Sequence, residues 1–285
     1  MADASAAELR ARHASVRAFG TLVDAMRGIA ASRLQKARLL IDGVDGYAQT
    51  VRSALLDALR AGGDASSLEP TASKSALWLV FGAENALDGG YSRAVLSHLP
   101  PGARFVLWGS HALRAAHALS LAPESMAPLI ARSASAIEAA DRLQGLLDEA
   151  LAKKAASSVE LLFGELTARG NGHEVRHERL LPLDLRQELE AGKSATSLPP
   201  LIHLSPRDLM RALVQEHVTT RLTRATLHSH AAENLSRLRA MASAHDNVEH
   251  MTESLESQER LLRQESITSE VIELAAGLTQ ASPDS

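Results

Sequence analysis

The C-terminal part of the chain is a long segment without helix breakers. Between Pro206 and Gly277 the sequence contains neither proline nor glycine. Ser205 and Pro206 fit the N-cap and the first position of a helix that begins there. About 70 residues of helix would extend for about 105 Å at 1.5 Å per residue. Helices in globular domains are far shorter, so we expect this one to project and to need a partner.

Both ends of the chain carry apolar residues spaced alternately by three and four. A period of 3.5 residues places one narrow stripe against a second helix. The N-terminal stripe lies in a helix expected from about Ser5 to Arg60 and comprises Val16, Phe19, Val23, Met26, Ala30, Arg33, Ala37, Leu40 and Val44. The C-terminal stripe comprises Met241, Ala244, Val248, Met251, Leu255, Gln258 and Leu262. The two stripes predict an antiparallel coiled coil of the chain ends.

The charges favour this pairing. Residues 8–38 contain seven basic and two acidic residues, whereas residues 231–285 contain ten acidic and four basic ones. Opposite charges on flanking positions help to select the partner and its orientation. The alternative is two separately solvated helix faces, since exposed ion pairs contribute little each.

The middle of the chain alternates short apolar runs with helical segments. Strands are expected at Ala76–Phe81, Arg104–Gly109, Val159–Leu166 and Glu174–Leu181, and helices at Tyr91–Leu99, His111–Leu119 and Ser133–Ala156. Segments rich in small residues and proline, Gly62–Ser73 and Lys193–Pro200, are typical of linkers. The sequence therefore predicts a coiled-coil shaft of residues 1–62 and 205–285, and a central Rossmann-like α/β domain of residues 63–204 with a mostly parallel sheet.

Composition excludes several classes of protein. Aromatic residues make up 3% of the chain, which favours elongated helical packing over a large compact core. The net charge of −4 does not suggest nucleic-acid binding. The absence of cysteine excludes disulfides and thiolate metal sites. We also expect no membrane-spanning segment and no signal peptide, because no apolar run is long enough.

Three motifs, in order, resemble those of one family, the γ subunits of F-type ATP synthases. Residues 24–38, DAMRGIAASRLQKAR, are similar to its N-terminal signature. Residues 232–247, AENLSRLRAMASAHDN, resemble its second signature, with Glu233, Arg237 and Met241 in register. Residues 263–274, RQESITSEVIEL, match its C-terminal pattern. The central loop ENALDGGYS at residues 84–92 keeps Leu87, Gly89 and Gly90 of the family's loop.

The resemblance implies a central-stalk rotor without catalytic activity of its own. It would couple ion translocation through a membrane ring to ATP synthesis or hydrolysis in partner subunits. Implied partners are the α and β subunits, the ε subunit and the ring of c subunits, at the cytoplasmic face of a bacterial inner membrane. By resemblance, the partner-contact residues are Met26, Arg33, Arg237, Gln264, Thr268, Gly89 and Gly90.

The chain also departs from the family pattern. Asp24 stands where the family usually has lysine, and the central loop lacks the family's arginine and cysteine. We interpret the chain as a divergent γ subunit, such as that of an alternative, sodium-translocating F-type ATPase. The coupling ion, proton or sodium, stays open.

Other chemistry finds little support in the sequence. There is no G-x-x-x-x-G-K-[ST] phosphate loop, and loop 82–90 lacks G-x-G-x-x-G, so we expect no bound cofactor. The histidine pairs His173/His177 and His228/His230 lack a defined third ligand, so we expect titrating surface histidines and no metal site. No catalytic residue stands out. Two alternatives remain: a coiled-coil adaptor or scaffold with an α/β head, and a small-molecule enzyme built on the central sheet.

Overall fold

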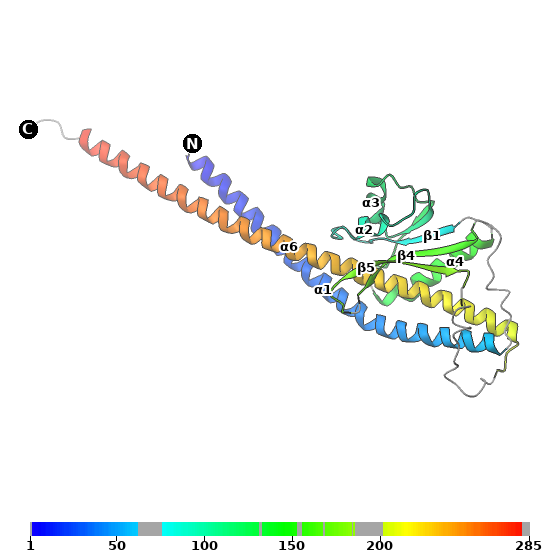
Figure 1. Ribbon diagram of the computed structural model, residues 1–285. Helices are drawn as coiled ribbons and strands as arrows, with labels where there is room; N and C mark the ends of the chain where they lie inside the picture. Colours follow the sequence, from blue (N-terminus) through cyan, green and yellow to red (C-terminus); the bar gives the residue numbers. More distant parts are fainter. Residues whose placement is uncertain are drawn as a thin grey trace, which may run out of the picture. The chain divides into compact units, whose positions relative to one another are not determined.

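Figure 1 shows the computed structural model of the chain. The structure describes residues 2–61, 76–130, 133–152, 156–167, 169–183, 185 and 202–280. The two expected linkers, Gly62–Ser73 and Lys193–Pro200, lie outside the described residues. The chain forms two compact units, one of Met1–Ile29 with Arg239–Ser285 and the other of Ala30–Leu238.

Both long helices are confirmed. Helix α1 spans Ala2–Arg60 and helix α6 spans Pro206–Gln280. The Ser205 hydroxyl accepts the backbone N–H of Asp208 at 3.2 Å, which confirms the expected N-cap of α6. Helix α1 continues through Gly43 and Gly46, where a Cβ atom would meet nothing within 4 Å. Neither glycine therefore marks a turn or a close contact.

In the smaller unit the two helices pair antiparallel. His13 contacts Glu259 at 3.1 Å, and Asp24 contacts His245 at 2.9 Å, so positions that rise along α1 meet positions that fall along α6. Val23 is buried on α1, and Met241 and Leu255 are buried on α6. The contact of His13 with Glu259 follows the expected pairing of basic α1 with acidic α6, whereas in the contact of Asp24 with His245 the carboxylate is on α1.

The predicted apolar stripe is wrong at several positions. Phe19 and Leu40 are 53% and 42% exposed, and Met251 and Gln258 are exposed too. The buried positions of α1 include Gly20, Leu34 and Ile41 instead. An ideal Cβ on Gly20 would lie 2.9 Å from Val248, so the seam passes through the glycine and turns Phe19 outward. A straight helix also drifts relative to a strict 3.5-residue repeat.

The larger unit contains a five-stranded sheet in the order β3-β2-β1-β4-β5. Strands β1 (Ala76–Phe81), β2 (Arg104–Trp108), β3 (Ser125–Ala127) and β4 (Ser158–Leu166) run parallel, and β5 (His173–Leu181) is antiparallel to β4. The mostly parallel sheet and the four expected strands are confirmed. Strand β3 was not predicted, because its three partly exposed residues carry no apolar run.

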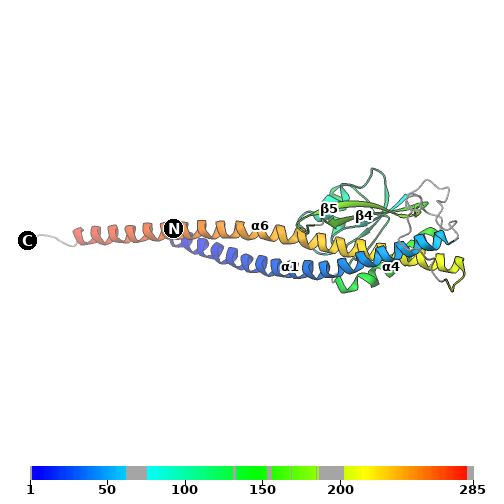
Figure 2. The same cartoon turned by 60° about the horizontal axis from the view of Figure 1, so that its bottom comes forward.

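Helices cover both faces of this sheet. Helices α1, α6 and α4 (Ala136–Ala152), preceded by the short 3₁₀ turn Ser133–Ser135, pack on one face (Figure 2). Helices α2 (Tyr91–Leu96) and α3 (Ala112–Ala118) pack on the other. Trp108, Phe81 and Phe163 are buried at 1% exposure or less in the first core. Parallel sheets need both faces covered, which accounts for the near-continuous apolar strands.

None of the described helices has an 18-residue window apolar enough to span a bilayer.

Candidate functional site

Part of helix α6 is buried on all sides. Every residue from Ala225 to Arg237 is buried, because the sheet, α1 and the loop after β1 surround this stretch. Helices buried all round are normally apolar. Here the buried residues include the polar side chains His228, Ser229, His230, Glu233, Asn234, Ser236 and Arg237. Buried polar groups need hydrogen-bond partners, and buried charges need charged partners.

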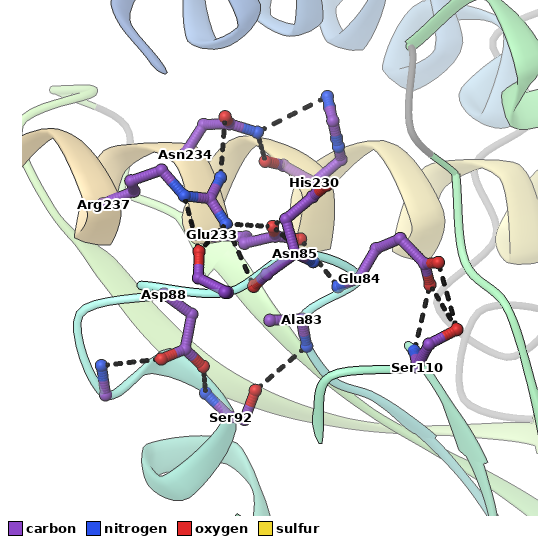
Figure 3. A network of polar contacts seen from close by, with 12 residues as sticks. Ala83, Glu84, Asn85, Asp88, Ser92, Ser110, His230, Glu233, Asn234 and Arg237 are labelled. Carbon is purple, nitrogen blue, oxygen red and sulfur yellow. Dashed lines mark hydrogen bonds and ion pairs between the residues drawn. The ribbon is translucent and has the colours of Figure 1, made fainter. Parts of the chain in front are cut away.

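Glu233 and Arg237 form a buried ion pair that binds the loop after β1 (Figure 3). Their oxygen and nitrogen atoms lie 2.6 Å apart, and the side chains are 0% and 4% exposed. The Glu233 carboxylate accepts the backbone N–H groups of Glu84 and Asn85 at 3.2 and 3.3 Å. The Arg237 guanidinium donates to the carbonyls of Asn85 and Ala86 at 3.1 to 3.2 Å. We call this arrangement the loop clamp.

Asn234 extends the loop clamp along α6. Its amide oxygen accepts a hydrogen bond from Arg237 at 3.2 Å, and its amide nitrogen donates to the His230 carbonyl at 2.7 Å. The same nitrogen lies 3.4 Å from Nε2 of His230. His230 is fully buried, and its neutral ring fits this setting because two arginines are near it.

Two acidic residues of the loop after β1 hold it in place through hydrogen bonds to backbone N–H groups. Glu84 accepts the backbone N–H groups of Ser110 at 3.0 Å and of Leu129 at 2.8 Å, so one carboxylate joins the loops that follow β1, β2 and β3. Asp88 accepts the N–H groups of Gly90 and Ser92 at the start of α2. These bonds hold the carboxyl edge of the parallel strands in one conformation, the edge where such sheets commonly bind ligands.

The pKa of His230 predicts a pH-dependent stability. Burial, and then the positive charges of Arg33 and Arg237, lower the pKa of His230 from 6.5 to about 4. The unfolded chain therefore binds a proton at this residue between pH 6.5 and 4, whereas the folded chain does not. The contribution of the neutral His230 to the free energy of unfolding is fully present above pH 6.5. It falls as the pH drops, and about 3 kcal/mol of it is lost by pH 4. Urea unfolding from pH 7.5 to 4.5 measures this loss.

A His230→Gln variant should flatten the pH dependence, because glutamine does not titrate and still offers an acceptor to Asn234. The control is His98→Gln, at an exposed histidine on the surface near α2, which should keep the wild-type slope. Parallel curves for wild type and His230→Gln would contradict the assignment.

The partner-contact residues implied by resemblance lie in different places. Arg237 is in the loop clamp, and Gly89 and Gly90 are exposed in the clamped loop, both with positive φ angles of 62° and 83°. Arg33 is half-buried in the same unit and lies near His230. In the other unit Met26 is half-buried. Gln264 and Thr268 are exposed and share one turn of α6, where the Thr268 hydroxyl donates to the Gln264 carbonyl at 2.8 Å.

The expectation of surface histidines is wrong for one pair. His228 and His230 are only 4% and 0% exposed. The expectation failed because the sequence pattern of α6 does not reveal that this stretch is covered on all sides. His177 is exposed and bonds Glu160 at 3.0 Å. Among the described residues no group of three or more histidine and acidic side chains could hold a metal ion.

Sequence reasoning did not assign a role to Glu84 or Glu233. A signal for Glu233 was present, because Glu233 and Arg237 are four residues apart on a helix and such pairs face each other. No comparable signal exists for Glu84. Its partners, Ser110 and Leu129, are far from it in sequence. The three loops that carry these residues meet only when the parallel strands align.

Comparison with known proteins decides the family. The ATP synthase family model matches residues 5–280. A gamma chain of Kineococcus radiotolerans is 30% identical, over 92% of this chain and 92% of its own length. The chain belongs to the ATP synthase gamma chain family. A gamma chain of Bacteroides fragilis is 26% identical over 96% of this chain and 99% of its own length.

Solved structures agree at the level of the fold. A chain in the Euglena gracilis mitochondrial ATP synthase structure that contains OSCP, F1 and the c-ring has a TM-score of 0.72 at 13% identity, over 98% of this chain and 95% of that one. A chain of the rotor from the same enzyme has a TM-score of 0.68 at 12% identity, over 93% and 99%. In this gamma chain family member the second signature supplies the loop clamp. The family also accounts for all three motifs, which neither the adaptor nor the enzyme alternative does.

Proposed function

We propose that the chain is the central-stalk rotor subunit of an F-type ATP synthase and couples ion translocation to ATP synthesis or hydrolysis in the catalytic subunits by rotation. The observation that carries this proposal is the match to the ATP synthase family over residues 5–280, together with the gamma chain that is 30% identical over 92% of this chain. As a gamma chain it is a non-catalytic subunit. Two long paired helices suit a rotor, because a two-stranded coiled coil resists twisting better than a single helix does.

The proposed partners are the α and β subunits, the ε subunit and the c-subunit ring. They follow from the family, and the similar Euglena chains come from assemblies described as rotor and as OSCP/F1/c-ring. We place the complex at the cytoplasmic face of a bacterial inner membrane, with this chain as a peripheral component. The coupling ion, proton or sodium, stays open.

The proposed shaft comprises residues 1–62 and 205–285, and the proposed foot comprises residues 63–204. Parts of both helices also pack with the sheet, in the unit Ala30–Leu238, so shaft and foot share a core. Such a core suits a rotor, since torque on the helices then reaches the foot through buried contacts. Within this division we propose contacts with the catalytic ring at Met26, Arg33, Arg237, Gln264 and Thr268, and a partner contact of the foot at Gly89 and Gly90.

Arg237 differs from the other proposed contacts. Its guanidinium is 4% exposed and holds Glu233, Asn85 and Ala86. A partner could use it only by replacing the loop carbonyls as acceptors. Gln264 and Thr268 are exposed and can be reached without rearrangement.

The rotor function predicts a defined complex. Co-expressed with the α and β subunits of the same source, the chain should purify with about three copies of each per chain, and the isolated chain should show no ATPase activity. Gel filtration and quantitative mass spectrometry measure the ratio. A stable homodimer without these partners would favour the adaptor alternative.

The same complex tests the contact residues. Because the chain has no cysteine, a single introduced cysteine gives an unambiguous cross-link. A Thr268→Cys variant should cross-link to the catalytic ring, whereas an Arg114→Cys control on exposed α3 should not. The proposed contact would be contradicted if both variants cross-linked equally, or if neither variant cross-linked.

A further inference from the structure

A polar pocket in the unit Ala30–Leu238 is not used by the proposed rotor function. Its volume is about 420 Å³, and its walls come from α1, β5 and α6. Half of its ten lining residues are arginines, namely Arg52, Arg176, Arg179, Arg221 and Arg224. Two carboxylates line it with them, those of Asp45 and Glu178. The lining residues alone therefore carry an excess of three positive charges, of which Glu160 and Glu165, paired with Arg179 and Arg224 from outside the lining, offset two. We call it the arginine pocket.

The two lining carboxylates are engaged by the inner arginines. Asp45 receives a hydrogen bond from Nε of Arg224 at 2.7 Å, and Glu178 receives one from an Nη atom of Arg221 at 2.5 Å. Arg224 also bonds Glu165. These bonds fix the planes of two guanidinium groups, which are 18% and 19% exposed. The inner wall is thus preorganised, so binding an anion there costs little ordering of side chains.

The outer arginines remain open to solvent. The side chains of Arg176 and Arg179 are 57% and 59% exposed. Arg179 has Glu160 at 3.0 Å, and Nε of Arg176 lies 3.4 Å from Glu178 and 3.7 Å from Glu165. A guanidinium has five N–H donors, so these contacts leave several donors of each arginine for a ligand.

One buried donor in the arginine pocket has no acceptor. The Nε atom of Arg221 is buried and makes no hydrogen bond. Because this atom is buried, an anion in the pocket could approach Arg221 only through the rest of its side chain, which is 19% exposed.

From this geometry we infer that the arginine pocket binds a small multivalent phosphate, as a free polyphosphate or as a phosphate headgroup. Guanidinium forks match the oxygen spacing of phosphate and bind it bidentately. The volume lies at the small end of ligand pockets. None of the lining residues is Phe, Tyr or Trp, so the lining favours the phosphate over the base of a nucleotide. The inference goes beyond the rotor function and does not depend on it.

Calorimetric titration of the full chain with tripolyphosphate tests the inference. We expect saturable binding that an Arg176→Gln/Arg179→Gln variant weakens about tenfold or more, since each lost charge-assisted hydrogen bond is worth at least 1.4 kcal/mol, or tenfold. Both arginines are exposed at the rim, and the buried Glu160 that Arg179 contacts keeps its contact with His177, so the variant should fold, which circular dichroism verifies. The matched control is Arg114→Gln/Arg142→Gln, which removes two exposed arginines from α3 and α4 and should bind like wild type.

Flotation with vesicles separates the two sources of phosphate. Binding to phosphatidic acid vesicles that tripolyphosphate competes away identifies a headgroup, and binding of tripolyphosphate alone identifies a free anion. The inference fails if wild type binds neither probe, or if the pocket variant and the control variant lose affinity equally.

Discussion

Replacing Arg237 by methionine should lower the free energy of unfolding by about 3–5 kcal/mol, because breaking a buried ion pair leaves its other charge uncompensated. Glu233 would then keep its negative charge at 0% exposure, with neutral donors from the loop, namely the backbone N–H groups of Glu84 and Asn85 and the side-chain amide of Asn85. The carbonyls of Asn85 and Ala86 would lose the donors that Arg237 provides. Urea unfolding of the full chain measures the loss.

The matched control lies two residues further along α6. Arg239 is exposed, so Arg239→Met removes the same side-chain charge from the same helix at a cost within about 0.5 kcal/mol. A similar small loss in both variants would mean that the loop clamp contributes nothing beyond a surface charge. A large loss at Arg237 alone would also show that this signature residue of α6 stabilises the fold through the loop clamp, whatever contact it makes in the complex.

Replacing Gly109 by alanine should be nearly as severe. Gly109 has a φ angle of 115°, where L-residues are strained. An added Cβ would lie 2.7 Å from the carbonyl oxygens of both Gly82 and Ala83. Strain and overpacking each cost about 1–3 kcal/mol, so together we expect a loss of about 2–6 kcal/mol. The backbone around Gly109 also carries Ser110, a partner of Glu84, so loosening it should disturb the clamped loop.

A control separates strain from crowding. Gly102 also has a positive φ angle, 71°, but a Cβ there would meet nothing within 4 Å. Gly102→Ala should therefore show only the conformational cost of about 1–2 kcal/mol. If Gly109→Ala proves no more destabilising than Gly102→Ala in urea unfolding, then close backbone approach is not what requires glycine at this position.

Local patterns in the sequence were enough for the main elements. The segment from Pro206 onward lacks breakers, and Ser205 caps it, so α6 could be placed within a few residues of its observed bounds. The short apolar runs at Ala76–Phe81 and Arg104–Trp108 predicted β1 and β2, because such runs are typical of buried strands. Propensity, capping and hydrophobic runs act over a few residues, so a linear reading captures them.

Faces and neighbours were less predictable. Phe19 fits a 3.5-residue stripe, yet Gly20 occupies the seam, because the approach of Val248 depends on the partner helix. His228 and His230 look like ordinary helix histidines, yet sheet and helices surround them. The arginine pocket brings together residues from α1, β5 and α6 that no sequence spacing connects.

The sequence by itself therefore determined the two long helices, the mostly parallel sheet and, through three ordered motifs, membership of the gamma chain family. Only the tertiary structure decided what the signature residues do locally. Glu233 and Arg237 are four residues apart on α6, which makes their pairing predictable. Their burial and their hold on Asn85 and Ala86 are not, since the loop and the helix are separated by about 150 residues and meet only when the sheet packs on α6. Because Glu233 and Arg237 are buried, water cannot solvate their charges, so these charges need hydrogen-bond partners within the protein. The loop after β1 provides those partners, and the loop clamp is the result.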